Sequence, residues 1–185
     1  MTDQEKWQLA ISALTGEFAA LAEEDRRWLA NQAELCKGLK KAMVRLSDEA
    51  GGSGICAACR GECCLTGKYH VTVVDILVLL VSGEELFTPR FGAGHCPYLG
   101  EKGCLLAAAY RPSNCVSFNC QRIEALQEPV IANEFTRLEG ELRDSFIAFE
   151  RRFGNRFANG LLMNFERDIL VGRGRLLKTV AGQGQ

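Results

Sequence analysis

One stretch of the chain reads Cys56-Ala-Ala-Cys59-Arg-Gly-Glu-Cys63-Cys64. Cysteines set two and three residues apart sit on one tight turn, close enough for several thiolates to bind the same ion. Further pairs follow as Cys96-x7-Cys104 and Cys115-x4-Cys120, so eight of the nine cysteines of this 185-residue chain fall between positions 56 and 120. The pattern predicts a metal site with the candidate ligands Cys56, Cys59, Cys63, Cys64, Cys96, Cys104, Cys115 and Cys120.

The chemistry of these ligands limits the choice of metal. Thiolates favour soft or borderline ions, so the predicted cofactor is zinc or iron, the latter as an iron–sulfur cluster. Eight cysteines are enough for two tetrahedral zinc sites, or for one four-cysteine site with further thiols nearby. His95, beside Cys96, is a candidate to replace one sulfur, and His70 is a weaker one. A surface or hydrogen-bonded histidine is the more common arrangement for both.

Composition and charge exclude several classes of partner. The chain is 47% hydrophobic and 24% charged, as in ordinary globular proteins. Its net charge is −1 and its pI is near 6.2, so it lacks the basic surface that attracts nucleic acid. The longest nearly apolar run, residues 71–81, is about half the ~20 residues that a membrane span needs. We expect neither a nucleic acid nor a membrane as partner.

The N-terminal residues predict the compartment. Residues 1–7 are polar and acidic and lack the apolar core of a signal peptide. We therefore expect a cytoplasmic protein, in which thiols stay reduced and clustered cysteines indicate metal binding or catalysis. A secreted disulfide scaffold is the alternative reading, and the odd number of cysteines argues against it.

The first of three predicted parts, residues 1–50, is a long helix or a helical hairpin. Apolar residues alternate four and three apart from Trp7 to Leu46, which is the seam of a helix packed lengthwise on another helix. Leu35 lies on this seam, and Cys36 lies off it as an incidental helical thiol. Asp25 interrupts the seam, so two helices with a turn near Gly16 or Asp25 are the alternative to one.

The other two parts are a cysteine-rich metal-binding module, residues 51–128, and a C-terminal helical segment, residues 129–185. The second part begins with Gly51-Gly-Ser-Gly54, which we expect to be a flexible link. Thr72-Val-Val-Asp75 has the pattern of a capping box and predicts a short buried helix up to Val81.

The third part contains an apolar stripe, rich in phenylalanine, from Ile131 to Phe157. It predicts one helix of about 25 residues, and a final helix is expected over 165–180. The stripe is suited to pack along the seam of the first helix, or to form a coiled-coil homodimer. The predicted fold is mainly α, with long N- and C-terminal helices packed together around a loop-rich, cysteine-ligated metal module.

The cysteine segment resembles a known family. The order Cys56-x2-Cys59-x3-Cys63-Cys64, Cys96-Pro97-Tyr98-Leu99, Cys104, Tyr110-Arg111-Pro112-x2-Cys115 and Phe118-x-Cys120 is similar to that of the CxxCxxxCC (YkgJ-type) family of zinc- or iron-chelating domains. The resemblance covers residues 56–120, about a third of the chain, and leaves the flanking helices outside. It implies metal binding and does not define a reaction.

Two classes of function follow from these observations. The first is a structural or accessory protein that holds zinc or an iron–sulfur centre, with its helices free to pack a partner protein or a second copy. The second is an enzyme, either redox or protein-modifying, because a related CxxC…CC arrangement occurs in flagellin lysine methylases. The sequence shows no methyl-donor loop, no HExxH motif and no Ser/His/Asp set. Whether the protein is an enzyme is left open by the sequence.

Overall fold

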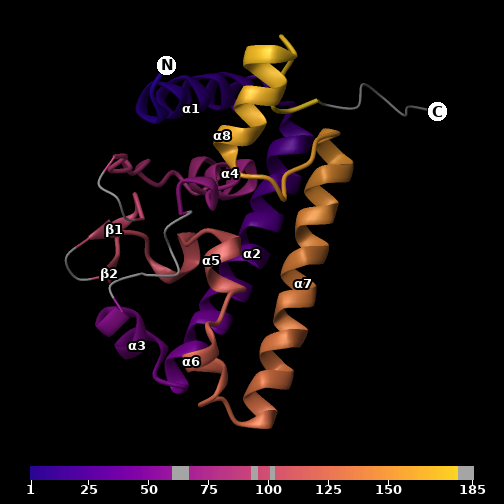
Figure 1. The fold of residues 1–185 in the computed structure, drawn as a ribbon. Coiled ribbons are helices and arrows are strands. Elements are labelled where there is room, and N and C mark those ends of the chain that lie inside the picture. Colours follow the sequence, from indigo (N-terminus) through magenta and orange to yellow (C-terminus); the bar gives the residue numbers. More distant parts are fainter. Residues whose placement is uncertain (60–66, 93–95, 101–102, 179–185) are drawn as a thin grey trace.

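The computed structural model describes residues 1–59, 67–92, 96–100 and 103–178, and the described part is mainly helical (Figure 1). Cys63, Cys64 and His95 lie outside the described residues. The α-helices are α1 (Asp3–Ala19), α2 (Glu23–Glu49), α3 (Gly52–Cys59), α4 (Val73–Val81), α5 (Ser113–Val116), α6 (Gln121–Glu124), α7 (Pro129–Phe153) and α8 (Leu161–Asn164). The other elements are η2 (Gly67–Tyr69), β1 (Leu99–Gly100), β2 (Gly103–Cys104), η3 (Ala108–Tyr110) and the π-helix η4 (Phe165–Val171).

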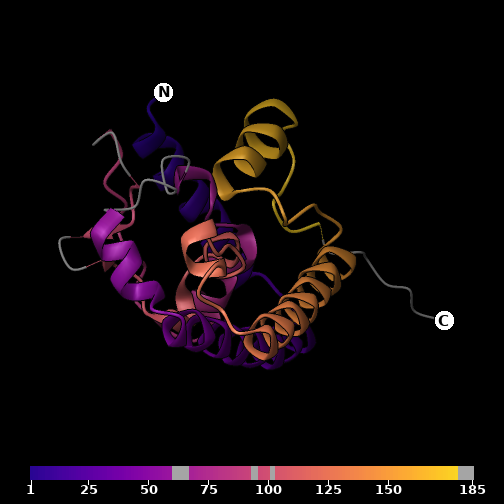
Figure 2. The same cartoon turned by 60° about the horizontal axis from the view of Figure 1, so that its bottom comes forward.

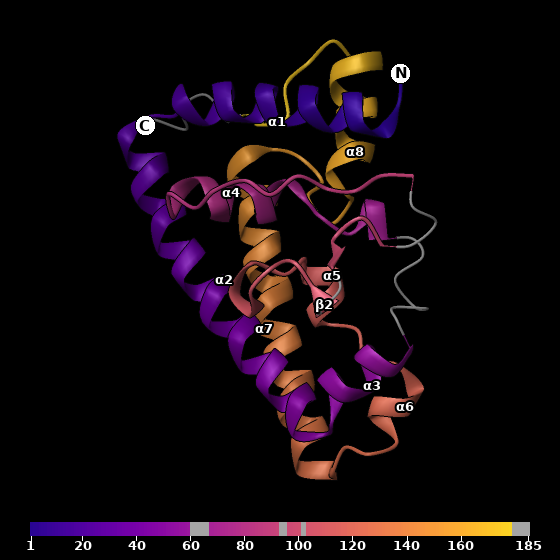
Figure 3. The ribbon, with the colours of Figure 1, turned by 90° about the vertical axis from the view of Figure 1, so that its left-hand side faces the viewer.

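The N-terminal part is a pair of helices, as the second alternative predicted. α1 starts at a capping box in which Thr2 and Glu5 bond each other's backbone, and three residues separate the end of α1 from the start of α2. Figure 3 shows α1 lying across the end of α2. The break shifts the face that α2 buries, so the predicted seam holds at Leu39 and Leu46 and fails at Leu35. Leu35 is exposed, whereas Cys36 is fully buried and belongs to the core.

α2 and α7 run side by side and form the main support of the fold (Figure 1). The phenylalanine stripe of α7 packs against α2, with the Trp28 ring 5.1 Å from that of Phe149 and edge-on to it. At the same end, Arg152 of α7 forms an ion pair with Asp25, 2.7 Å away, at the start of α2. The apolar stripes predicted for the two ends of the chain are therefore buried against each other within one chain.

The link between α2 and the cysteines differs from our prediction. Instead of a flexible segment, residues 52–54 form the first turn of α3. Gly51 takes the left-handed conformation that ends α2 (φ 78°), and the Asp48 carboxylate then accepts a bond from the Ser53 backbone N–H. A side chain at position 52 would meet the Ser47 carbonyl oxygen at 2.7 Å, so glycine is needed there for close approach. Glycine at positions 51 and 52 therefore permits the tight turn between α2 and α3.

α4 forms as the capping box at Thr72 predicts, and it carries a buried ion pair. The Asp75 carboxylate caps the helix by accepting from the Thr72 backbone N–H at 2.8 Å. It also accepts from Lys40 of α2 at 2.5 Å and from the Ser113 hydroxyl of α5 at 3.3 Å. Both charged side chains are almost wholly buried, at 0% and 2% exposure. The pair therefore joins α2, α4 and the helix that carries Cys115.

The C-terminal segment ends its helical structure at Val171, earlier than we predicted. It is attached at both ends. Leu161 donates its backbone N–H to the Val71 carbonyl at 2.7 Å, and the Glu17 carboxylate of α1 accepts from the backbone of Leu176 and Leu177. Residues from α1, α2, α4, α7 and this segment share one hydrophobic core. Within the described ranges, no helix combines the length and the apolar character that crossing a membrane requires.

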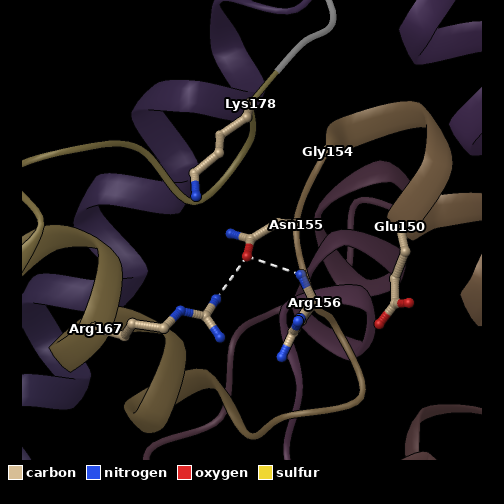
Figure 4. Close-up of a pocket in the computed structure, with 6 residues that line it drawn as sticks. All are labelled: Glu150, Gly154, Asn155, Arg156, Arg167 and Lys178. Carbon is tan, nitrogen blue, oxygen red and sulfur yellow. Dashed lines mark hydrogen bonds between the residues drawn. The ribbon is translucent and has the colours of Figure 1, made fainter.

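A cavity of about 390 Å³ lies at the end of α7, lined by Glu150, Gly154, Asn155, Arg156, Arg167 and Lys178 (Figure 4). Several polar side chains that line the cavity already form hydrogen bonds within the protein. Arg167 donates to the Asn155 side-chain oxygen at 2.6 Å, and Arg167 and Lys178 both bond the buried carboxylate of Asp168. Burial alone raises the pKa of Asp168, but hydrogen bonds from Arg167, Asn155 and Lys178 outweigh it and lower the value to about 2. These contacts fasten the C-terminal segment to the end of α7.

Replacing Lys40 tests the buried ion pair. In Lys40→Met the Asp75 charge stays buried without its cation, and we expect the free energy of unfolding to fall by about 3–5 kcal/mol in urea titrations. The double variant Lys40→Met/Asp75→Asn removes both charges and should recover part of this loss. Lys41→Met, at an exposed position of the same helix, is the control and should change little. An equal, small effect at both lysines would contradict the account.

Replacing Asp168 tests the C-terminal network. We expect Asp168→Asn to lower the free energy of unfolding at pH 7 by about 2 kcal/mol, because hydrogen bonds to a charged group are lost. A lowered carboxyl pKa stabilises the fold above its ordinary value of 3.8 and ceases to do so as pH falls through about 2. The difference between wild type and variant should therefore shrink between pH 4 and pH 2. Asp144→Asn, on the exposed face of α7, should show no such difference at any pH.

Candidate metal centre

The predicted ligands fall into a first cysteine block, residues 56–64, and a second cysteine block, residues 96–120. The first block lies partly on α3. Cys56 and Cys59 are one helical turn apart, and the Cys59 Sγ lies 3.5 Å from the Cys56 carbonyl oxygen. The Cys56 side chain is exposed and that of Cys59 is half-buried, so both thiols are accessible at the end of the helix. The predicted ligands Cys63 and Cys64 follow directly in sequence, outside the described residues.

The second block is spread over three short elements. Cys96 is buried and precedes the antiparallel β1–β2 hairpin, in which Cys104 pairs with Leu99. Cys115 lies on α5, and Cys120 is the residue before the first turn of α6. Figures 1 and 2 show α3 and the hairpin on the side of α2 that faces away from α7. The cysteine-bearing elements are therefore gathered on one side of the helical support.

Two contacts bring the surroundings of the two blocks together. His70, three residues after Gly67, has its Nδ1 atom 3.2 Å from the Cys115 Sγ. A Cβ atom at Gly67 would lie 2.7 Å from the Cys96 Sγ, so only glycine allows the backbone that follows the first block to approach this thiol. α3 also contacts α6, the helix that follows Cys120. Chain segments next to both blocks therefore meet at Cys96 and Cys115.

The described residues do not by themselves complete a metal site. Among them, no three cysteine, histidine, aspartate or glutamate side chains lie close enough together to hold one ion. Cys56 and Cys59 lie one turn apart on α3, and His70 lies against Cys115. Of the two histidines, the sequence favoured His95, which lies outside the described residues, whereas the structure places His70 against a cysteine.

The electrostatic surroundings separate the ninth cysteine from the others. Burial raises the pKa of the Cys36 thiol to about 11, so this side chain keeps its proton at neutral pH. A metal ligand must be a thiolate, and Cys36 therefore does not suit the role of a ninth ligand. The sequence also argued against a ligand here, but it placed Cys36 off the buried seam, whereas the side chain belongs to the core. At His70, burial lowers the pKa, which favours the neutral imidazole that can ligate a metal or share a proton with a thiol.

Polar contacts anchor the second block to the helical support. Ser113, two residues before Cys115, donates to the Asp75 carboxylate, and Ser47 of α2 donates to the Asn119 side-chain oxygen at 3.0 Å, one residue before Cys120. Outer contacts of this kind orient the ligands of metal sites. They could not be predicted, because neither serine carries a sequence signal that identifies its partner.

Three buried polar atoms have no hydrogen-bond partner within the described part of the chain: the Tyr98 hydroxyl and the side-chain nitrogens of Asn119 and Gln127. Two of them belong to residues next to predicted ligands, since Tyr98 lies two positions after Cys96 and Asn119 directly precedes Cys120. Buried polar atoms are seldom left without a partner, and one common explanation is a bound ion or group that satisfies them.

Comparison with known proteins identified no relative of this chain. No protein-family model matches the chain, and neither a curated protein nor a solved structure is significantly similar to it.

Proposed function

We propose that this protein is a cytoplasmic metal-binding protein that holds zinc or an iron–sulfur centre through the cysteine thiolates between residues 56 and 120, in a structural or accessory role. The observation that carries the proposal is the contact between His70 and Cys115, at 3.2 Å. It joins the segment that follows the first cysteine block to the second block, as a site that uses both blocks requires.

The donor set fits the proposed metals. Cysteine thiolates are the usual ligands of both structural zinc and iron–sulfur clusters, and structural zinc sites often include a histidine as well. In a tetrahedral zinc site, a thiolate and an imidazole ligand are about 3.5 Å apart, given bond lengths of ~2.3 and ~2.0 Å. The separation of the His70 and Cys115 donor atoms, 3.2 Å, is close to this value. This separation supports a role for both residues at one ion, either as joint ligands or as hydrogen-bonded neighbours.

The surrounding fold suits a metal centre with a structural role. The second block is built from two-residue strands and four-residue helices, which bury little apolar surface of their own. Short elements of this kind are commonly held by a metal, whose binding contributes directly to folding free energy. Cysteines that precede η2 in the sequence and cysteines that follow it would then bind the same metal, which would hold the parts of the module together.

Metal and sulfide analysis after anaerobic purification tests the proposal. We expect the purified protein to contain either zinc without acid-labile sulfide, or iron with sulfide and a visible absorption band. Removal of the metal with a chelator should lower the melting temperature, because the metal binds only the folded chain. Purification without either metal, together with disulfides in a thiol titration, would refute the proposal.

Single cysteine variants supply the matched comparison. Cys115→Ser removes a proposed ligand, and we expect it to weaken metal binding by more than the 10–100-fold typical of losing an outer contact. Cys36→Ala removes the buried thiol of α2 and should leave metal content unchanged even if stability falls. Equal metal content in wild type and Cys115→Ser would exclude Cys115 from the site.

A further inference from the structure

The cavity at the end of α7 brings three cationic side chains together, those of Arg156, Arg167 and Lys178 (Figure 4). The carboxylate of Glu150 also lines it, and Asp168 is bonded by two of the cations. Two carboxylates thus face three cations, which leaves an excess of one positive charge. The volume of about 390 Å³ lies in the range of small-molecule sites. An anionic ligand suits this balance of charge.

Arg167 is held firmly and keeps donors for a ligand. Its Nε and Nη2 atoms donate to the Asp168 carboxylate at 3.1 and 2.6 Å. Nη2 also donates to the side-chain oxygens of Asn155 and Asn164, at 2.6 and 2.7 Å. A guanidinium carries five N–H donors, and the two on Nη1 have no acceptor among the described residues. Because the guanidinium is already fixed, a ligand that binds these donors has little further entropy to remove.

The backbone of Lys178 is fixed to the end of α7. Its N–H donates to the Phe153 carbonyl at 2.8 Å, and its own carbonyl oxygen lies so close to Gly154 that a Cβ there would meet it at 2.9 Å. The ammonium group donates to Asp168 at 3.3 Å, which leaves two of its three donors without an acceptor in the described part of the chain. Figure 4 shows this ammonium group turned toward the guanidinium of Arg167. The two cations therefore face the same space.

Arg156 supplies the third cation, and its side chain supports no other part of the described structure. The residue is exposed, and only its backbone N–H is engaged, by the Asn155 side-chain oxygen at 2.8 Å. Its guanidinium forms no hydrogen bond or ion pair with the described residues. Glu150, the nearby acid, accepts instead from the backbone N–H groups of Phe157 and Ala158. An unpaired cation beside two others is repelled by them, and a bound anion removes that repulsion.

From this arrangement we infer that the cavity binds the phosphate group of a small phosphate monoester. The three cations come from the end of α7, from η4 and from the segment after η4. A tetrahedral oxyanion offers an oxygen to each of them, whereas a carboxylate has only two oxygens. Arginine binds phosphate through paired N–H donors, and lysine binds it as a point charge. The site is separate from the proposed metal centre and does not depend on it.

Titration of the full chain with glycerol phosphate, followed in backbone amide NMR spectra, tests the inference. We expect saturable shifts of the Gly154 and Arg156 amides and none at Gly140, in the middle of α7. Acetate at the same ionic strength should bind at least about 10-fold more weakly. Arg156→Gln should weaken glycerol phosphate binding by about 10-fold or more, because hydrogen bonds to a charged group are lost. Its midpoint of urea unfolding should stay at the wild-type value, since the side chain holds nothing in the fold.

Arg151→Gln is the matched control, because it removes an exposed cation of the last turn of α7 that does not line the cavity. It should keep the wild-type affinity. Shifts that do not saturate, an unchanged affinity in Arg156→Gln, or equal losses in both variants would overturn the inference. Acetate that binds as tightly as glycerol phosphate would overturn the choice of phosphate. Metal content is measured separately, so failure here leaves the proposed metal centre standing.

Discussion

The fold depends on satisfying one buried charge, the carboxylate of Asp75. A carboxylate that is 2% exposed is tolerated only when cations and hydrogen-bond donors replace its water. Lys40 supplies the cation from α2, Thr72 supplies two donors at the start of α4, and Ser113 supplies one from α5. Three elements far apart in sequence must therefore meet at one point, and the meeting point lies two residues from Cys115. Directional contacts of this kind select one arrangement of the helices, whereas apolar packing alone would tolerate several.

This constraint links the helical support to the cysteine module. α2 and α7 bury each other's apolar faces and hold Lys40 in place, while the short elements that carry the cysteines have little core of their own. The position of Cys115 is set from one side by Ser113 and approached from the other by His70. If Cys115 binds the proposed metal, contacts that orient its side chain beforehand would lower the entropic cost of gathering the ligands.

Several parts of this structure follow from local sequence rules. The capping box at Thr72 and the phenylalanine stripe of α7 depend on residues a few positions apart, and both formed as predicted. Errors arose where tertiary contacts decide. Residues 52–54 became helical because Asp48 caps them and Ser47 crowds them, and Cys36 replaced Leu35 in the core because the break after Ala19 shifted the helical phase. His70 and Cys115 are 45 positions apart in sequence, and no local sequence pattern predicts their contact.

The proposed metal centre requires cysteine sulfur from both blocks to hold one metal ion or cluster. X-ray absorption spectroscopy of the metal-loaded protein tests it most directly, because it reports the elements bound to the metal and their distances. The proposed metal centre should give a first shell dominated by sulfur at ~2.3 Å, with no more than a minor contribution from a nitrogen ligand such as His70. A first shell made only of oxygen and nitrogen, unaffected by Cys115→Ser, would contradict it.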